Sequence, residues 1–244
     1  MNLKHKTGTL YMIPTLLGES DWALVLPATV QKVIAENSHF VVENEKSARK
    51  FIKQICPDKI QSSLVLYPLN KHTESKDIPG YLQACMEGQS VGMISEAGCP
   101  GIADPGALLV AAAHQKNIAV VPLVGPSSIF LALMASGFNG QKFAFHGYLP
   151  IDKSEKRQAL KQLEKESQQK VQTQIFMETP YRNDKFLEDM LQTLQATTLL
   201  CIACDITLST EFIKTKSVAQ WKKDKISLHH RPTIFLIGSS NESN

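Results

Sequence analysis

Long hydrophobic runs are absent from this chain of 244 residues. No apolar stretch approaches the roughly 20 residues that span a bilayer, and the opening MNLKHKTGTLYMIP lacks the apolar core and cleavage site of a signal peptide. Charge of one sign is also missing, because 26 basic residues accompany 23 acidic ones. This balance excludes a disordered polyelectrolyte and an overtly nucleic-acid-like composition. We therefore expect a globular, cytoplasmic protein with no membrane partner and one or two domains.

Cysteine is scarce and odd in number, with five residues in the chain. Cys201 and Cys204 form a CxxC pair, but the surrounding LLCIACDI is typical of a buried strand. Strand side chains three residues apart point to opposite faces of a sheet, whereas a zinc knuckle or a redox dithiol needs the two thiols to converge. We interpret both residues as structural cysteines of the core, and we predict no metal site.

The motifs of common nucleotide and zinc sites are also lacking, since the chain contains no GxGxxG, GxxxxGK[ST] or HExxH. Instead, strand and helix patterns alternate without an internal repeat. The predicted strands are Thr9–Pro14, His39–Glu43, Leu64–Pro68, Val91–Ser95, Ala119–Leu123, Phe143–Tyr148, Gln174–Met177, Leu199–Asp205, Glu211–Thr215 and Thr233–Gly238. The predicted helices are Ala28–Glu36, Asn44 or Ser47 to Ile55, Pro79–Glu87, Ala107–Gln115, Ser128–Ser136, Asp152 to about Gln168, Asn183–Leu194 and Ala219–Lys223.

This alternation predicts α/β architecture, with mainly parallel sheets covered on both faces. We expect two α/β domains, residues 1–124 and 125–244, of which the second is richer in hairpin-like connections. Ligands of open α/β sheets bind beyond the carboxyl ends of the strands. In the first half, the loops at residues 14–18, 95–106 and 125–128 occupy that edge.

The loop at residues 95–106 is the most informative of the three, because it combines glycines and prolines with two acids, Glu96 and Asp104. Glycine permits close backbone approach, and proline stiffens the loop. Ser127 in the third loop starts a helix whose free N–H groups attract a carboxylate. Together they favour a metal-free ligand with a carboxylate, a cation and a purine, whereas a stiff but inert surface turn is the alternative.

Residues 95–106, SEAGCPGIADPG, resemble the SDAGTPxISDPG motif of the ribosomal RNA small subunit methyltransferase I family. That family belongs to the tetrapyrrole methylase-like, class III S-adenosylmethionine-dependent methyltransferases. Further similarities follow in the family's order along nearly the whole chain. They are Gly8–Tyr11 with Pro14-Thr15 to GTLYxVxTPIGN, Glu43 with Arg49-Lys50 to AEDTRxTRKLL, Gly125–Ser128 to GPSA, Ser136-Gly137 to SGL, Phe145–Pro150 to FxGFLP, and Glu178–Arg182 to EAPHR. Seven motifs in register make the resemblance specific.

The resemblance implies two α/β domains of the tetrapyrrole methylase type, with the cofactor S-adenosyl-L-methionine in the cleft between them, and usually a homodimer. The residues that it implies on the first-domain side of the cofactor are Leu17, Ser95, Glu96, Gly98, Cys99 and Ser127. Those that would line the adenosine side from the second domain are Met177, Ala203 and Pro232. A sulfonium cation is stabilised by nearby oxygens, and methyl transfer is an in-line displacement governed by positioning.

The resemblance further implies 2′-O-ribose methylation of small-subunit (16S) ribosomal RNA, with ribosomal RNA or the small subunit as partner. A ribose hydroxyl must lose a proton; Glu43 is the leading acid–base candidate and Glu178 the next. Arg49 and Arg182 are candidates for positioning phosphate, and a local salt bridge or strand-end cap is the alternative for each of the four. A group of helical cations either contacts RNA or forms a solvated face. This group is Lys153, Lys156, Arg157, Lys161 and Lys165.

Several positions depart from the family's motifs. Glu96 replaces an aspartate, residues 42–46 read VENEK where the family has AEDTR, and residues 16–19 read LLGE in place of PIGN. Lysine lacks the bidentate phosphate recognition of arginine, and we expect no counterpart of the family's small C-terminal extension. Because these changes fall on the substrate side, two alternatives stay open. One is methylation of a tetrapyrrole or other small molecule, and the other is a binding or regulatory paralogue that kept the cofactor site without catalysis.

Overall fold

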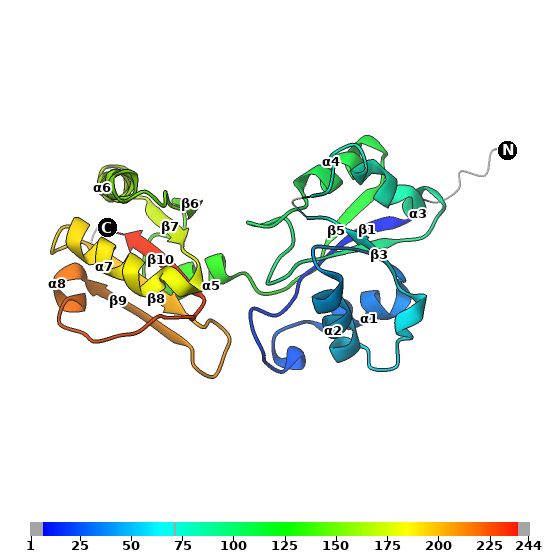
Figure 1. Ribbon diagram of the computed structural model, residues 1–244, viewed down its shortest axis with the longest axis horizontal. Helices are drawn as coiled ribbons and strands as arrows, with labels where there is room; N and C mark the ends of the chain where they lie inside the picture. Colours follow the sequence, from blue (N-terminus) through cyan, green and yellow to red (C-terminus); the bar gives the residue numbers. More distant parts are fainter. Residues whose placement is uncertain (1–6, 71, 239–244) are drawn as a thin grey trace. The chain divides into compact units, whose positions relative to one another are not determined.

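The computed structural model describes residues 7–70 and 72–238. The chain divides between Pro126 and Ser127 into two compact units, each built around one five-stranded sheet (Figure 1). Every helix in these described ranges is too short or too polar to cross a lipid bilayer.

The first unit is a doubly wound parallel sheet with the strand order β3-β2-β4-β1-β5. Its strands are β1 Thr9–Ile13, β2 His39–Val42, β3 Val65–Pro68, β4 Val91–Ile94 and β5 Ala119–Pro122. Its α-helices are α1 Ala28–Glu36, α2 Glu45–Ile55, α3 Gln83–Met86 and α4 Ala107–Gln115, and its 3₁₀ helices are η1 Trp22–Leu24, η2 Gln61–Ser63 and η3 Ile78–Leu82.

Apolar side chains are buried on both faces of this sheet, as the unbroken run Val91–Ile94 requires. One face packs against α1 and α2, and the other packs against η3, α3 and α4. Because all five strands run in one direction, their carboxyl ends share one edge, and the three predicted loops start there.

The second unit holds a mixed sheet with the order β6-β7-β10-β8-β9. Its strands are β6 Phe143–Tyr148, β7 Thr173–Met177, β8 Leu199–Cys204, β9 Phe212–Ser217 and β10 Thr233–Gly238. Its helices are α5 Ser128–Ser136, α6 Lys153–Lys170, α7 Asn183–Thr193, α8 Val218–Trp221 and the 3₁₀ helix η4 Pro180–Arg182.

The expectation of a mainly parallel sheet is wrong for this second unit. Only β6 and β7 pair in parallel, whereas β7–β10, β10–β8 and β8–β9 are antiparallel. The α7 crossover returns the chain to β8 in the direction of β7, and β10 fills the position between them while running the opposite way (Figure 1). A short loop after β8 turns the chain directly into β9, and such a connection can only join antiparallel strands.

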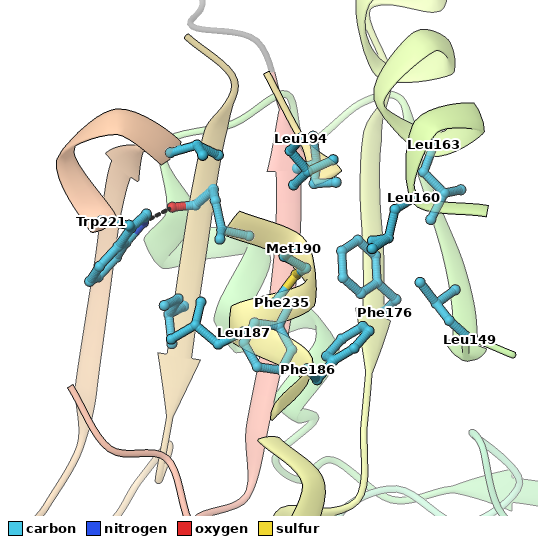
Figure 2. Packing of buried hydrophobic residues seen from close by; sticks show 14 of the residues in the cluster. Leu149, Leu160, Leu163, Phe176, Phe186, Leu187, Met190, Leu194, Trp221 and Phe235 are labelled. Atoms are coloured by element: carbon cyan, nitrogen blue, oxygen red, sulfur yellow. Dashed lines mark hydrogen bonds between the residues drawn. The ribbon is translucent and has the colours of Figure 1, made fainter. Parts of the chain in front are cut away.

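An aromatic cluster forms the core between this sheet and helices α6, α7 and α8 (Figure 2). Phe176 and Phe235 stack at 6.3 Å, and the ring of Phe186 meets Phe235 edge-on at 5.3 Å. The indole Nε1 of Trp221 donates a hydrogen bond to the carbonyl of Leu200 at 2.8 Å, so this buried polar atom is satisfied (Figure 2). Helix α5 packs on the opposite face of the sheet.

The CxxC pair lies in β8 as predicted, with Cys204 in this cluster and Cys201 on the opposite face. Both side chains are fully buried, and burial raises the pKa of the Cys201 thiol to about 11. The interpretation of these residues as buried structural cysteines is confirmed.

Most helices have the predicted bounds, but the helix predicted at Pro79–Glu87 is a 3₁₀ helix followed by a single α-turn. Pro79 lacks an N–H and Gly80 weakens regular helix, so the start of this segment favours the shorter form. The predicted caps are confirmed elsewhere. The Asn44 side chain accepts hydrogen bonds at the start of α2, Asp152 does so at the start of α6, and Gly137 ends α5 with a φ of 76°.

Candidate active site

Two of the loops at the carboxyl edge of the first sheet are tied together by buried hydrogen bonds. The backbone N–H of Thr15 donates to the carbonyl of Gly98 at 2.9 Å. The Ser95 hydroxyl donates to the same carbonyl at 2.5 Å and lies 3.2 Å from the Thr15 hydroxyl. Since the Ser95 side chain is already engaged within the protein, it fixes the shape of the loop after β4.

Two glycines let these loops approach each other and the third loop closely. Gly98 adopts a φ of +71°, a left-handed conformation, and a Cβ atom there would lie 3.0 Å from Leu17 Cδ2. A Cβ atom on Gly125 would overlap the ring of Pro14. The Cys99 thiol donates to the carbonyl of Pro126 at 3.3 Å. The structure thus brings four predicted cofactor residues into one edge of the first unit, and they are Leu17, Ser95, Gly98 and Cys99.

A cavity of ≈ 530 Å³ opens between the loop after β1, helix α2 and the loop after β4. Leu17, Ser95 and Glu96, three of the predicted cofactor residues, are in its wall. Ser47 and Lys50 of α2 also line it, although neither was predicted as a site residue. Their spacing of three residues, directly after the Asn44 cap, is the signal that places them on one helix face.

Side chains that line this cavity form a hydrogen bond and an ion pair with each other. The Ser47 hydroxyl donates to Glu96 Oε1 at 2.6 Å, and Lys50 Nζ lies 2.9 Å from Glu19 Oε1. The Glu19 pair is highly exposed, so water screens it strongly. Glu96 therefore has a defined orientation, while Glu19 and Lys50 can separate at little cost.

An acidic group, consisting of Glu43, Glu96 and Asp104, gathers at the same edge of the first sheet. Burial raises the pKa of the Asp104 carboxyl to about 6, and the negative charges of Glu43 and Glu96 add to this rise. Asp104 Oδ2 is buried and has no hydrogen-bond partner within the described ranges. An unpartnered carboxylate in a negative field fits a ligand that brings a positive charge, such as the sulfonium or ammonium group of S-adenosylmethionine.

Arg49, a predicted phosphate-positioning residue, is used within the fold. Its Nη1 donates to the carbonyl of Gln61 at 2.7 Å, and its Nη2 lies 3.9 Å from Glu45 Oε2. Gln61 begins the 3₁₀ helix η2, which precedes the amino end of β3. The structure therefore directs the Arg49 guanidinium toward η2, and Arg49 does not share the contacts of the acidic group.

The predicted adenosine-side residues align across the sheet of the second unit. Ile234 pairs with both Met177 and Ala203 in the β7-β10-β8 register, and Pro232 lies two residues before it. The strand spacing places Met177 and Ala203 about 10 Å apart. The Ala203 side chain is fully buried, whereas Met177 is half-buried and Pro232 is exposed. Met177 and Pro232 are thus the accessible members of this row.

Glu178 follows Met177 and is held by its neighbours. Its Oε1 accepts hydrogen bonds from the Thr179 N–H at 2.6 Å and from Arg182 Nη2 at 2.8 Å. Burial by itself raises the pKa of Glu178, but these bonds and the Arg182 charge outweigh it and lower the pKa overall. Arg182 Nε is buried without a partner in the part of the chain that the structure describes, whereas the side chain as a whole is 32% exposed, so the outer part of this guanidinium can reach a ligand.

Ser127 caps the start of α5 without a side-chain hydrogen bond to the helix. It belongs to the second unit, so its predicted place on the first-domain side is wrong, because its helix packs under the second sheet.

Among the predicted RNA-contacting cations of α6, Lys156 lies 3.0 Å from Asp189, and both side chains are nearly buried at 12% and 10% exposure. Lys156 therefore stabilises the packing of α6 against α7.

Comparison with known proteins places this geometry in a family. The family model of Tetrapyrrole (Corrin/Porphyrin) Methylases matches residues 10–221. The chain is 32% identical over 244 residues to the Ribosomal RNA small subunit methyltransferase I of Buchnera aphidicola subsp. Schizaphis graminum, covering 97% of this chain and 80% of that protein. It is 30% identical over 240 residues to the protein of the same name from Escherichia coli O157:H7, covering 96% and 78%.

The crystal structure of the methyltransferase CobJ superposes with a TM-score of 0.62 at 16% identity, covering 96% of this chain and 95% of that one. This likeness establishes the tetrapyrrole methylase fold, as predicted. The chain is a methyltransferase that depends on S-adenosyl-L-methionine. The resemblance seen in the seven sequence motifs is confirmed, and the chain belongs to the ribosomal RNA small subunit methyltransferase I family of the tetrapyrrole methylases.

Proposed function

We propose that this enzyme transfers a methyl group to a ribose 2′-hydroxyl of small-subunit (16S) ribosomal RNA. The observation that carries the proposal is its similarity to proteins named Ribosomal RNA small subunit methyltransferase I over nearly its whole length. The tetrapyrrole alternative has weaker support, because CobJ is only 16% identical and shares the fold alone. The proposed partner is therefore ribosomal RNA or the small subunit, and the proposed location is the cytoplasm, where ribosomes are found.

The proposed cofactor residues of the first unit act through shape and charge. S-adenosylmethionine, when bound, supplies an electrophilic methyl group on a sulfonium. Leu17, Gly98 and Cys99 present a rigid backbone edge, and Ser95 keeps that edge in place through its bond to Gly98. Glu96 and the acidic field around Asp104 favour the positive charge.

The proposed contribution of the second unit is recognition of the adenosine and of the carboxylate. Met177 and Pro232 offer accessible apolar surface, and Ala203 supplies the close-packed backbone behind it. Ser127 opens α5, a helix of nine residues whose first N–H groups attract a carboxylate.

Glu43 is the proposed acid–base residue. Its carboxylate is exposed at the end of β2 and shares a negative field with Asp104. It would accept the proton that the ribose hydroxyl loses when the methyl group passes from the sulfonium sulfur to the ribose oxygen, which leaves a neutral thioether. Glu178 fits this role less well, because its lowered pKa reflects a carboxylate already bound to Arg182. Glu178 instead orients Arg182, whose partly exposed guanidinium positions a phosphate. Arg49 anchors α2.

A homodimer is also part of the proposal. Phe130 and Met134 of α5 are 50% and 79% exposed, and exposed large apolar side chains on one helix are typical of a contact surface. Sedimentation of the purified protein checks this point directly, and a monomer at micromolar concentration would contradict it.

Methyl transfer to under-methylated 30S subunits tests the proposed function. Labelled cofactor should introduce label into 16S ribosomal RNA, at a linkage that resists alkaline cleavage because its 2′-oxygen is blocked. Glu43→Gln should abolish transfer while cofactor binding weakens only modestly, because Glu96 and Asp104 remain, and Glu36→Gln, an exposed acid on α1, serves as the matched control. Label in a base, or in a tetrapyrrole offered in parallel, would contradict the ribose assignment. Cofactor binding without turnover on any acceptor would favour the regulatory paralogue.

A further inference from the structure

Positive charge is concentrated in one stretch of the second unit. Residues 211–231 contain six basic and two acidic side chains, a net charge of +4, whereas the whole chain carries +3. This stretch covers the edge strand β9, helix α8 and the loop that follows them (Figure 1). Such clustering on one face is the electrostatic pattern of a nucleic-acid contact.

The same stretch lines an open groove of ≈ 820 Å³, which we call the β9 groove. Its wall includes the cations Lys214, Lys216, Lys223, Lys225 and Arg231, together with Phe212. Lys214 and Lys216 are two residues apart in β9 and so project from the same face of the strand. The groove is therefore lined by lysines from the strand on one side and from the loop after α8 on the other.

Two of these cations are fixed by partners inside the unit. Lys216 Nζ lies 2.6 Å from Asp224 Oδ2 and 5.1 Å from the centre of the Trp221 ring. Arg231 Nε lies 2.8 Å from Asp205 Oδ2. By contrast, Lys214, Lys223 and Lys225 are exposed and form no ion pair within the described ranges. Three ammonium groups thus remain available to a polyanion.

Helix α6 is the competing basic surface, with six basic and three acidic residues. Lys156 is committed to Asp189, and Lys170 pairs with Glu166. The cavity beside α6 measures only ≈ 170 Å³, which is smaller than the range of about 300–1,000 Å³ typical of small-molecule sites. The β9 groove falls within that range, so it has the room for a nucleotide that the α6 surface lacks.

Resting on the proposed function, we propose that the β9 groove binds the phosphate backbone of the ribosomal RNA substrate. Lys214, Lys223 and Lys225 contact phosphates, and the half-buried ring of Phe212 offers a face for a sugar or a base. An RNA strand suits a concave surface whose aromatic groups are half-buried or buried, whereas membrane binding needs apolar side chains that project outward.

The test compares two triple variants of the full-length protein that each remove three positive charges. The groove variant is Lys214→Gln, Lys223→Gln and Lys225→Gln, and the control is Lys153→Gln, Lys161→Gln and Lys165→Gln on α6. Affinity for 30S subunits is measured against salt concentration, with cofactor affinity, KM and kcat measured alongside. Each lost phosphate contact reduces the slope of log K against log salt by about 0.7, so the groove variant should lose about 2.

We expect the groove variant to raise KM for 30S subunits about tenfold at near-physiological salt, with unchanged kcat and cofactor affinity. If the wild type methylates 30S subunits but the groove variant keeps its slope and KM, the inference fails while the proposed function stands. A reduced slope in the α6 variant alone also overturns it. If the wild type neither binds nor methylates 30S subunits, both proposals fail. Binding to phosphatidylserine vesicles that only the groove variant loses, with RNA affinity intact, would reassign the groove to membranes.

Discussion

Asp104 in the first unit and Glu178 in the second are carboxylates in loops that follow sheet strands, yet their surroundings move their pKa values in opposite directions. Burial and two nearby acids raise the pKa of Asp104 to about 6. Burial also acts on Glu178, but the Thr179 N–H and the Arg182 charge outweigh it and lower the pKa. Asp104 has no partner within the described ranges, whereas Glu178 is paired with Arg182 of the same unit. Of the two carboxylates, only Asp104 is therefore free to interact with a ligand.

The sheets of the two units also differ in how they position the predicted site residues. The parallel sheet of the first unit gathers three loops at one edge, where buried bonds such as that from Thr15 to Gly98 fix their shape. The mixed sheet of the second unit instead aligns single residues, Met177 and Ala203, across β10. Changes in the loops at this edge of the first unit should therefore disturb ligand binding, and changes at Glu178 should disturb stability.

The largest expected effect is that of Glu178→Ala. The substitution removes the carboxylate that pairs with the Arg182 guanidinium. In the wild type this carboxylate is nearly buried, since the Glu178 side chain is only 4% exposed. Loss of one partner of a buried pair costs about 2–3 kcal/mol of unfolding free energy when the other partner is partly solvated. Urea unfolding, read as a midpoint shift at constant m-value, checks this.

The matched control for that prediction is Glu188→Ala, which removes an exposed i,i+3 pair with Lys185 and should not measurably change stability. Because the pKa of Glu178 is lowered, the stabilisation is fully present above its ordinary value of 4.5 and is lost as the pH falls below it. A Glu178→Ala variant as stable as the control would refute the structural role.

Gly125→Ala is expected to act on binding in the first unit. The added Cβ would overlap the Pro14 ring, and overpacking against a rigid group costs about 1–3 kcal/mol. The loop after β5 must move, so affinity for S-adenosylmethionine should fall about 30-fold, equivalent to about 2 kcal/mol. Calorimetric titration measures this. Gly140→Ala, where a Cβ meets no atom within 4 Å, should bind normally, and equal affinities of the two variants would contradict the prediction.

Asp104→Asn tests the raised pKa itself. Native Asp104 holds a proton up to a pH of about 6, whereas the unfolded chain releases it near 3.8. Ionising the buried group therefore destabilises the wild type progressively from pH 4 to pH 6. At pH 7 the Asn variant should exceed the wild type in unfolding free energy by about 1–2 kcal/mol, a value reduced for partial solvation.

The measurement for Asp104→Asn is urea unfolding at pH 4, 5, 6 and 7, with Asp58→Asn, an exposed acid of the same unit, as control. If the difference in unfolding free energy between variant and wild type is constant across this pH range, the pKa of Asp104 is not raised and the prediction is wrong. The same variant should bind S-adenosylmethionine more weakly, since the negative field is reduced.

Much of this arrangement was predictable from sequence, because apolar periodicity is a local property. The helix Ala28–Glu36 follows it to its observed ends. The helices Ala107–Gln115 and Ser128–Ser136 are nearly uniformly apolar, and local glycines mark their bounds, with Gly106 before the first and Gly137 after the second. The position of β10 between β7 and β8 was not predictable, because strand order depends on contacts between distant segments. The identity of the partners of a charged residue is equally non-local, as the Arg49–Gln61 bond illustrates.

The smallest effect concerns Arg49 and Arg182, both of which were predicted to position phosphate. Arg49 donates to the Gln61 carbonyl, so Arg49→Gln should cost about 1 kcal/mol of unfolding free energy and leave KM for 30S subunits unchanged. The Arg182 side chain is 32% exposed, and Arg182→Lys should raise KM because lysine cannot replace a planar set of donors. Steady-state kinetics and urea unfolding on both variants separate the roles. A higher KM for Arg49→Gln, with stability unchanged, would show that Arg49 contacts the substrate. It would then contradict the difference in role between Arg49 in the first unit and Arg182 in the second.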